Sequence, residues 1–86
     1  MPRVQEIRSE VRRLIRAVPF HPFALNMENG DRIVIEHPEN IAFNPKEANN
    51  GKVYDAFYVI SDSLRYSSTF EAVTGVAVID RGENAG

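Results

Sequence analysis

The chain has 86 residues, of which 43% are hydrophobic and 26% are charged. This size and composition are typical of one small domain with a modest core and no room for a deep active-site cleft. The sequence contains no cysteine, which excludes a disulfide framework, a thiolate zinc site and a cysteine nucleophile. No apolar run could cross a bilayer, and the arginines and glutamates near the start do not fit a signal peptide. We therefore expect a single domain 1–86, no membrane association and a cytoplasmic location.

The net charge of -2 conceals an uneven distribution along the chain. Residues 1–18 carry five arginines against two glutamates, a charge of +3, and the rest of the chain carries five basic and ten acidic side chains, a charge of -5. A basic segment on an acidic body can bind nucleic acid, and it can also dock on an acidic neighbouring subunit. Both interpretations stay open at this point.

Residues 3–17 are predicted to form an amphipathic helix. Apolar residues recur there at steps of three and four, at Val4, Ile7, Val11, Leu14, Ile15 and Val18. Pro2 suits the first helical position, and Pro19 forces the chain out of the helix at Val18. The arginines of this helix indicate either a solvated face or a cationic surface for a partner.

A stiff connection through Pro19 and Pro22 leads into a predicted hairpin. A two-residue turn on Asn29-Gly30 would set Leu25 opposite Val34 and leave the isoleucines of the second strand on the wrong face. A three-residue loop 28–30 with Gly30 in the left-handed region sets Leu25 opposite Ile33 instead. It also sets Phe23 opposite Ile35, so the apolar pattern favours the three-residue loop.

The rest of the chain is predicted to be sheet with tight turns. In order we expect a short strand at Ile41 and Phe43, a polar loop 45–51, a strand 53–60, a strand 64–70, a tight turn 71–75, a last strand 76–80 and a flexible tail 81–86. The strand 53–60 is apolar on both faces, so each face needs a cover. One helix cannot supply both covers, which indicates a neighbouring subunit.

This order of elements predicts a mainly β fold with one N-terminal α-helix, a small five-to-six-stranded antiparallel SH3-like or Sm-like barrel over residues 22–80. The boxes Pro19-Phe20-His21-Pro22-Phe23, Gly30-Asp31 and His37-Pro38-Glu39 resemble those of a group of short bacterial proteins of uncharacterised function, which implies a bacterial or phage source. The segment 72–79 is similar to the second Sm motif, with Thr74 where that family has its RNA-contacting arginine. Glu39 and Asn40 are the nearest counterparts of the first Sm motif. The Sm-like resemblance implies a barrel that assembles into a ring through its edge strands.

The side chains that could carry chemistry are few. The two histidines, His21 and His37, each precede a proline and show no metal-ligand spacing, and no nucleophile, base and orienting group come together. We expect no enzymatic activity, metal, cofactor or small-molecule substrate. The function predicted is a self-assembling module. The alternative is Sm-like binding of RNA or other nucleic acid, through either the arginine-rich helix or the face of Tyr54, Tyr58 and Arg65. The candidate nucleic-acid or partner surface is Arg8, Arg12, Arg13, Arg16, Tyr54, Tyr58 and Arg65, and the candidate interface between copies is Tyr54, Tyr58, Ile60, Val76 and Val78.

Overall fold

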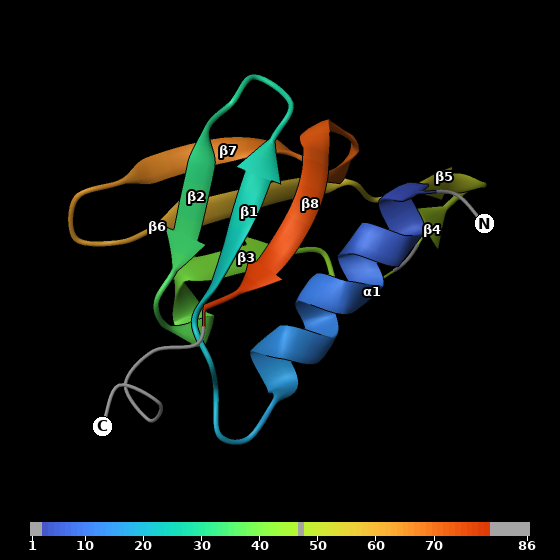
Figure 1. Ribbon diagram of the computed structural model, residues 1–86. Helices are drawn as coiled ribbons and strands as arrows, with labels where there is room; N and C mark the ends of the chain where they lie inside the picture. The colour runs from blue at the N-terminus through green and yellow to red at the C-terminus, as the bar shows by residue number, and fades with distance from the viewer. Residues whose placement is uncertain (1–2, 47, 80–86) are drawn as a thin grey trace, which may run out of the picture.

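The computed structural model describes residues 3–46 and 48–79, and it shows a helix followed by short strands (Figure 1). In chain order the elements are α1 (Arg3–Arg16), β1 (Phe23–Met27), β2 (Arg32–Ile35), η1 (Pro38–Asn40), β3 (Ile41–Phe43), β4 (Ala48–Asn49), β5 (Lys52–Val53), β6 (Ala56–Ile60), β7 (Arg65–Thr69), η2 (Phe70–Ala72) and β8 (Val73–Val78). The two η elements are single 3₁₀ turns. The predicted mainly β fold with one N-terminal helix is confirmed.

The strands form two three-stranded antiparallel sheets and one small ribbon. The first sheet has the order β2-β1-β8, the second has the order β3-β6-β7, and β4 pairs with β5 alone. Side chains from both sheets and from α1 meet in one core, whose fully buried members include Val11, Phe23, Leu25, Phe57 and Phe70. The described residues show two separate sheets and no closed ladder between them, so the predicted barrel is confirmed only as far as its strands and their direction.

The hairpin of β1 and β2 has the predicted register. Leu25 lies opposite Ile33, and Phe23 lies opposite Ile35. The Met27 N–H donates to the Asp31 carbonyl over 2.8 Å, which closes a three-residue loop, and the Gly30 N–H donates to the Met27 carbonyl over 2.9 Å. Gly30 has φ of 95°, a left-handed conformation that a residue with a Cβ rarely adopts. The prediction of a glycine-bulged hairpin is confirmed.

Helix α1 packs one face onto the sheets. Val11 and Leu14 are buried in the core, and Val4, Ile7 and Ile15 pack against it. The helix ends at Arg16, one residue before the predicted end, and Val18 lies outside it with 95% of its surface exposed. Val18 therefore does not belong to the apolar stripe that was predicted. No helix in the described part of the chain is long and apolar enough to span a membrane.

Three predicted elements differ from the structure. The polar loop 45–51 contains β4, which pairs with β5 directly after the loop, and the ribbon turns at Asn50 and Gly51 with φ of 52° and 81°. The predicted strand 53–60 is divided: β5 ends at Val53, Tyr54 and Asp55 belong to neither strand, and β6 begins only at Ala56.

The third difference is at the last strand, where the turn predicted over 71–75 ends at Ala72. Strand β8 already begins at Val73, which is buried and pairs with Met27. The predicted strand 76–80 was therefore placed too late. Residue 80 and the predicted tail 81–86 lie outside the described residues.

Candidate functional site

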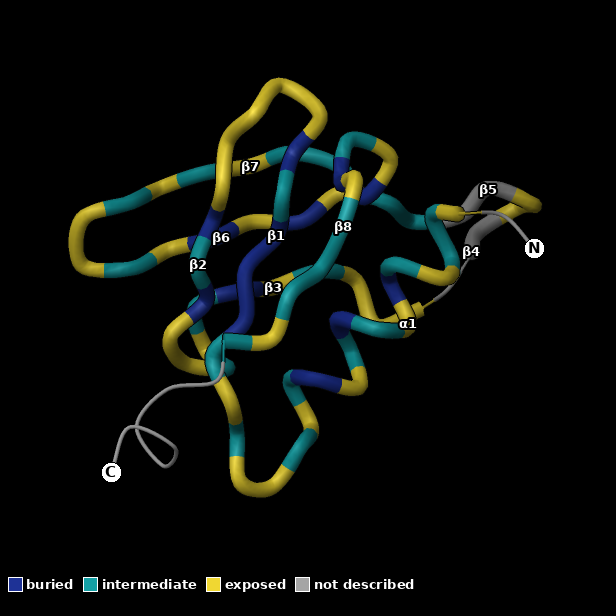
Figure 2. The backbone as a smooth tube through the Cα atoms, in the orientation of Figure 1, coloured by how far each residue is buried: buried dark blue, intermediate teal, exposed yellow. Residues whose placement is uncertain are grey.

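The outer face of the sheet β3-β6-β7 carries exposed apolar side chains. Phe57 and Val59 point into the core and are 0% exposed, whereas Tyr58 and Ile60 are 58% and 61% exposed. Figure 2 shows this alternation of exposed and buried residues along β6. Tyr58 lies between Ala42 on β3 and Ser67 on β7, and these small side chains leave its ring uncovered. We call this surface, with Tyr54, Ala56 and Arg65, the β6 face.

The predicted aromatic residues gather on the β6 face around the ring of Tyr58. A hollow of about 380 Å³ on one side of this ring is lined by Ala42, Phe43, Asn44, Tyr54, Ala56 and Tyr58. A second hollow of about 310 Å³ is lined by Tyr58, Val59, Ile60, Arg65, Tyr66 and Ser67. The structure thus gathers four of the predicted surface and interface residues around Tyr58: Tyr54, Tyr58, Ile60 and Arg65.

Strand β7 is an edge strand of the second sheet. Among residues 3–46 and 48–79 it pairs with β6 on one side only, with Tyr58 opposite Ser67. The Ser61 N–H donates to the Leu64 carbonyl, and the Phe70 N–H donates to the Asp55 carbonyl. These two bonds show that the backbone groups of Leu64 and Phe70 point toward the side of β6. Because backbone groups alternate in direction along a strand, those of Arg65, Ser67 and Thr69 point away from β6.

Strand β8 is an edge strand of the first sheet. The Ile79 N–H donates to the Pro22 carbonyl over 2.8 Å, and Ala77 lies opposite Ala24. The backbone groups of Val76 and Val78 therefore point away from β1. Val78 is 51% exposed and Val76 is half-buried. The residues predicted for the interface thus lie apart: Tyr58 and Ile60 are on β6, Tyr54 is just before that strand, and Val76 and Val78 are on β8 in the other sheet.

A charged surface lies on α1, apart from the β6 face. Ser9, Arg12, Arg13, Arg16 and Ala17 line one open hollow of about 740 Å³. The guanidinium of Arg13 also binds Glu10, with contacts of 3.2 Å and 2.5 Å, and this hydrogen-bonded carboxylate raises the pKa of Arg13 above its ordinary value. We call Arg12, Arg13 and Arg16 the arginine surface.

Arg8 does not belong to the arginine surface, and the prediction that it would is wrong. Its side chain is buried, with 3% of the residue exposed. The guanidinium donates to the carbonyls of Asn44 and Lys46 and lies 5.3 Å from the ring centre of Phe43. The helical spacing explains this position, because Arg8 follows Val4 by four residues and precedes Val11 by three. Arg8 therefore shares the core-facing side of the helix.

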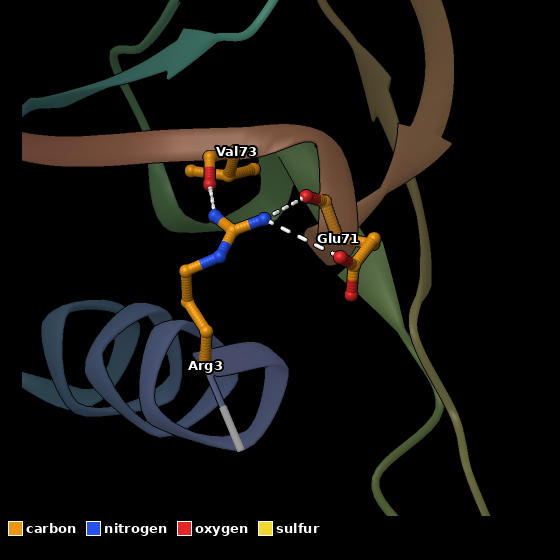
Figure 3. Close-up of polar contacts among 3 residues, drawn as sticks. All are labelled: Arg3, Glu71 and Val73. Carbon is orange, nitrogen blue, oxygen red and sulfur yellow. Dashed lines mark hydrogen bonds and ion pairs between the residues drawn. The ribbon is translucent and has the colours of Figure 1, made fainter.

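Arg3 was not predicted as an anchor, and it joins α1 to the start of β8 (Figure 3). Its guanidinium donates to the carbonyls of Val73 and Glu71, and it lies 3.6 Å from the Glu71 carboxylate. Its partners are about seventy residues away in sequence, so no local pattern could indicate the contact. The anchor fixes the start of α1 beside the start of β8.

We expect Arg3→Ala to lower the free energy of unfolding by about 1 kcal/mol, because it removes both bonds to backbone carbonyls. Glu71→Ala is the matched control: it removes only an exposed ion pair and should cost less than about 0.5 kcal/mol. Urea denaturation followed by circular dichroism measures both. Equal losses in the two variants would mean that the ion pair, and not the carbonyl contacts, holds the helix.

The two candidate nucleic-acid surfaces lie apart in the structure. The arginine surface is on α1, which lies beside β8, whereas Tyr58 and Arg65 are on β6 and β7 in the other sheet (Figure 1). Single-stranded nucleic acids are bound where aromatic and cationic side chains alternate along one groove. The two parts of the prediction are therefore separate surfaces.

His37 directly precedes the 3₁₀ turn η1. The His37 N–H donates to the Asn40 side chain over 3.0 Å, and the Asn40 amide donates to the Ile60 carbonyl over 3.1 Å, so this segment ties η1 to β6. Within residues 3–46 and 48–79, no three His, Cys, Asp or Glu side chains are arranged to hold a metal ion.

No protein-family model matches the chain, and neither the curated proteins nor the solved structures give a significant match.

Proposed function

We propose that this chain is a non-enzymatic β module of the SH3-like or Sm-like barrel type that assembles with copies of itself through edge strands. The strand order supports the barrel type. If β2 and β3 are the two halves of one bent strand interrupted by η1, the order becomes β8-β1-β2/β3-β6-β7. The turn η2 then precedes the last strand and α1 precedes the first, as in small barrels of this kind.

The observation that carries the proposal is the pair of edge strands on different sheets. β7 and β8 each pair on one side only, and each directs alternate backbone groups outward. An exposed edge is a template for another strand, and two different edges on one chain give a head-to-tail contact between copies. Such a contact closes into a ring when the rotation between copies allows it.

Exposed apolar residues beside these edges support the same proposal. Tyr58 and Ile60 lie next to β7, and Val78 is on β8 itself; more than half of each residue is exposed. Removing such side chains from water contributes about 25 cal/mol for each Å² that is buried. Pairing of β7 with β8 of the next copy would supply the cover that the apolar outer side of β6 requires.

We expect light scattering coupled to size-exclusion chromatography to give a mass well above the 9.7 kDa of one chain. Ser67→Pro removes an outward N–H from β7 and should give a monomer. Ser67→Ala keeps that N–H and should assemble like the wild type, with both variants folded by circular dichroism. A monomeric wild-type chain at micromolar concentration would overturn the proposal.

The alternative function is Sm-like nucleic-acid binding, and the observation in its favour is the arginine surface around one hollow. Under this alternative, labelled single-stranded RNA binds with an affinity that falls steeply as salt rises. Binding would then be lost in Arg12→Ala/Arg13→Ala. It would be lost in Tyr58→Ala/Arg65→Ala if the β6 face were the binding surface instead.

A further inference from the structure

We infer, on the premise of the proposed self-assembly, that the arginine surface of one copy binds an acidic end of the next copy. The acidic end consists of three exposed carboxylates: Glu36, Glu39 and Asp62. The occupant of the arginine surface is thus a second copy of this chain, and the contact adds charge complementarity to the pairing of edge strands.

The acidic end is a compact surface. Glu36 and Asp62 line one hollow of about 250 Å³ together with His37, Asn40, Ser61 and Ser63. The Asn40 side chain donates to the Ile60 carbonyl, which holds η1, and with it Glu39, beside the loop between β6 and β7. Three carboxylates from segments more than twenty residues apart therefore share one part of the surface.

The two charged surfaces lie on opposite sides of one copy. In Figure 1, α1 is at the right of the molecule, and the loop that joins β6 to β7 is at the far left. A single chain therefore cannot bring its own arginine surface onto its own acidic end. Contact between them requires a neighbouring copy, and because the two surfaces differ, that contact is head-to-tail.

The proposed edge pairing brings these surfaces toward each other. If β7 pairs antiparallel with β8 of the next copy, the Arg65 end of β7 lies beside the Val78 end of β8. Asp62 precedes Arg65 by three residues, so the acidic end is at this junction. The Arg3 anchor fixes the start of α1 at the start of β8, and the second half of α1 lies toward the other end of β8 (Figure 1). The arginine surface of the next copy is therefore on the same side of the junction.

The charges favour this contact over a contact between like surfaces. The arginine surface carries three cations beside Glu10, and the acidic end carries three carboxylates, with Arg65 three residues after Asp62 in the sequence. Opposite potentials steer two surfaces together and fix their orientation, whereas like charges oppose the symmetric arrangement. Few backbone groups of β8 are available to pair with another strand, since the Val73 carbonyl already accepts a hydrogen bond from Arg3. A charged contact would thus supplement a short edge.

Charge reversal tests the inference. Arg12→Glu/Arg16→Glu and Glu39→Lys/Asp62→Lys should each weaken self-association at least about tenfold, measured as the dissociation constant by sedimentation. A chain that carries all four changes should assemble again, because its surfaces have exchanged charge and remain complementary. Arg32→Glu/Glu28→Lys, a reversal at the β1–β2 hairpin, is the matched control and should assemble like the wild type. Circular dichroism establishes that every variant is folded.

Salt gives an independent measurement on the unmodified chain. Raising NaCl from about 0.1 M to about 1 M shortens the screening length from about 10 Å to about 3 Å. We expect wild-type self-association to weaken about tenfold over this range, and the control variant to follow it. Self-association that is unchanged or stronger at high salt would contradict the inference, because apolar contact alone would then explain it.

The outcomes separate this inference from the proposal on which it rests. If the wild type is a monomer, both fail. If Ser67→Pro abolishes assembly but the charge-reversed variants assemble like the wild type, only the charged contact is wrong. If Arg12→Glu/Arg16→Glu assembles normally but no longer binds a labelled single-stranded RNA that the wild type binds, the arginine surface belongs to nucleic acid. If the four-fold variant stays dissociated while folded, the two surfaces are not partners.

Discussion

Replacing Phe57 with alanine is expected to lower the free energy of unfolding by about 3–5 kcal/mol. The side chain is 0% exposed and lies where the second sheet meets the core. Its ring centre is 5.0 Å from that of Phe70 and 6.5 Å from that of Tyr66. Truncation removes these contacts and leaves a cavity that the surrounding strands cannot fill without moving. Domains of this size have a total stability of roughly 5–15 kcal/mol, so the loss can unfold the chain.

The neighbouring residue supplies the control for this experiment. Tyr58→Ala changes an aromatic residue of similar size on the opposite face of the same strand, and it should cost less than about 1 kcal/mol. Both variants are measured by urea denaturation at one protein concentration, because self-association would make stability depend on concentration. A larger loss for Tyr58→Ala than for Phe57→Ala would mean that the buried and exposed faces of β6 have been assigned the wrong way round.

Tyr58→Ala also connects stability with assembly. Its side chain contributes little to the core of one copy, so a folded variant that self-associates more weakly would assign the ring to the contact between copies. Phe57→Ala gives no such information, since any loss of assembly there follows from loss of the fold.

The parts of the fold that could be predicted are those set by local pattern. Gly30 and the alternation of Phe23, Leu25, Ile33 and Ile35 specify one register, because a shift by one residue would move the apolar side chains to the other face. The ribbon β4–β5 could not be predicted in this way. Its strands have two residues each, too few for alternation to indicate a strand, although Asn50 and Gly51 did indicate a turn.

Prediction of the candidate site from the sequence was limited in a different way. Both faces of 53–60 are apolar, which predicted a cover for each. The structure buries Phe57 and Val59 in the core and leaves Tyr58 and Ile60 exposed on the other face. The break at Tyr54 and Asp55 was missed, because the apolar pattern continues through these positions and gives no sign of a boundary. The contacts of Arg3 with Glu71 and Val73 leave no signature in the local sequence, whereas the helical spacing of Arg8 from Val4 and Val11 does indicate its core-facing side.

Arg8→Ala is expected to lower the free energy of unfolding by about 2–3 kcal/mol, a large effect for a charged residue on a helix. The guanidinium binds the carbonyls of Asn44 and Lys46, and charge-assisted bonds of this kind are stronger than those between neutral groups. Its contact with the Phe43 ring adds a cation–π term in a site with little water. The substitution would release the segment after β3 from the helix.

Two further variants separate the causes of this effect. Arg8→Met keeps an apolar stem over Phe43 but makes no hydrogen bond. It should therefore restore the stability that comes from packing and not the stability that comes from the hydrogen bonds. Arg12→Ala removes an arginine one turn away on the same helix, and because that residue lines an open hollow it should cost about 0.5 kcal/mol or less. If Arg8→Ala and Arg12→Ala were equally stable in urea, Arg8 would be a surface residue. The interaction that joins α1 to the segment after β3 would then have to be sought elsewhere in the helix.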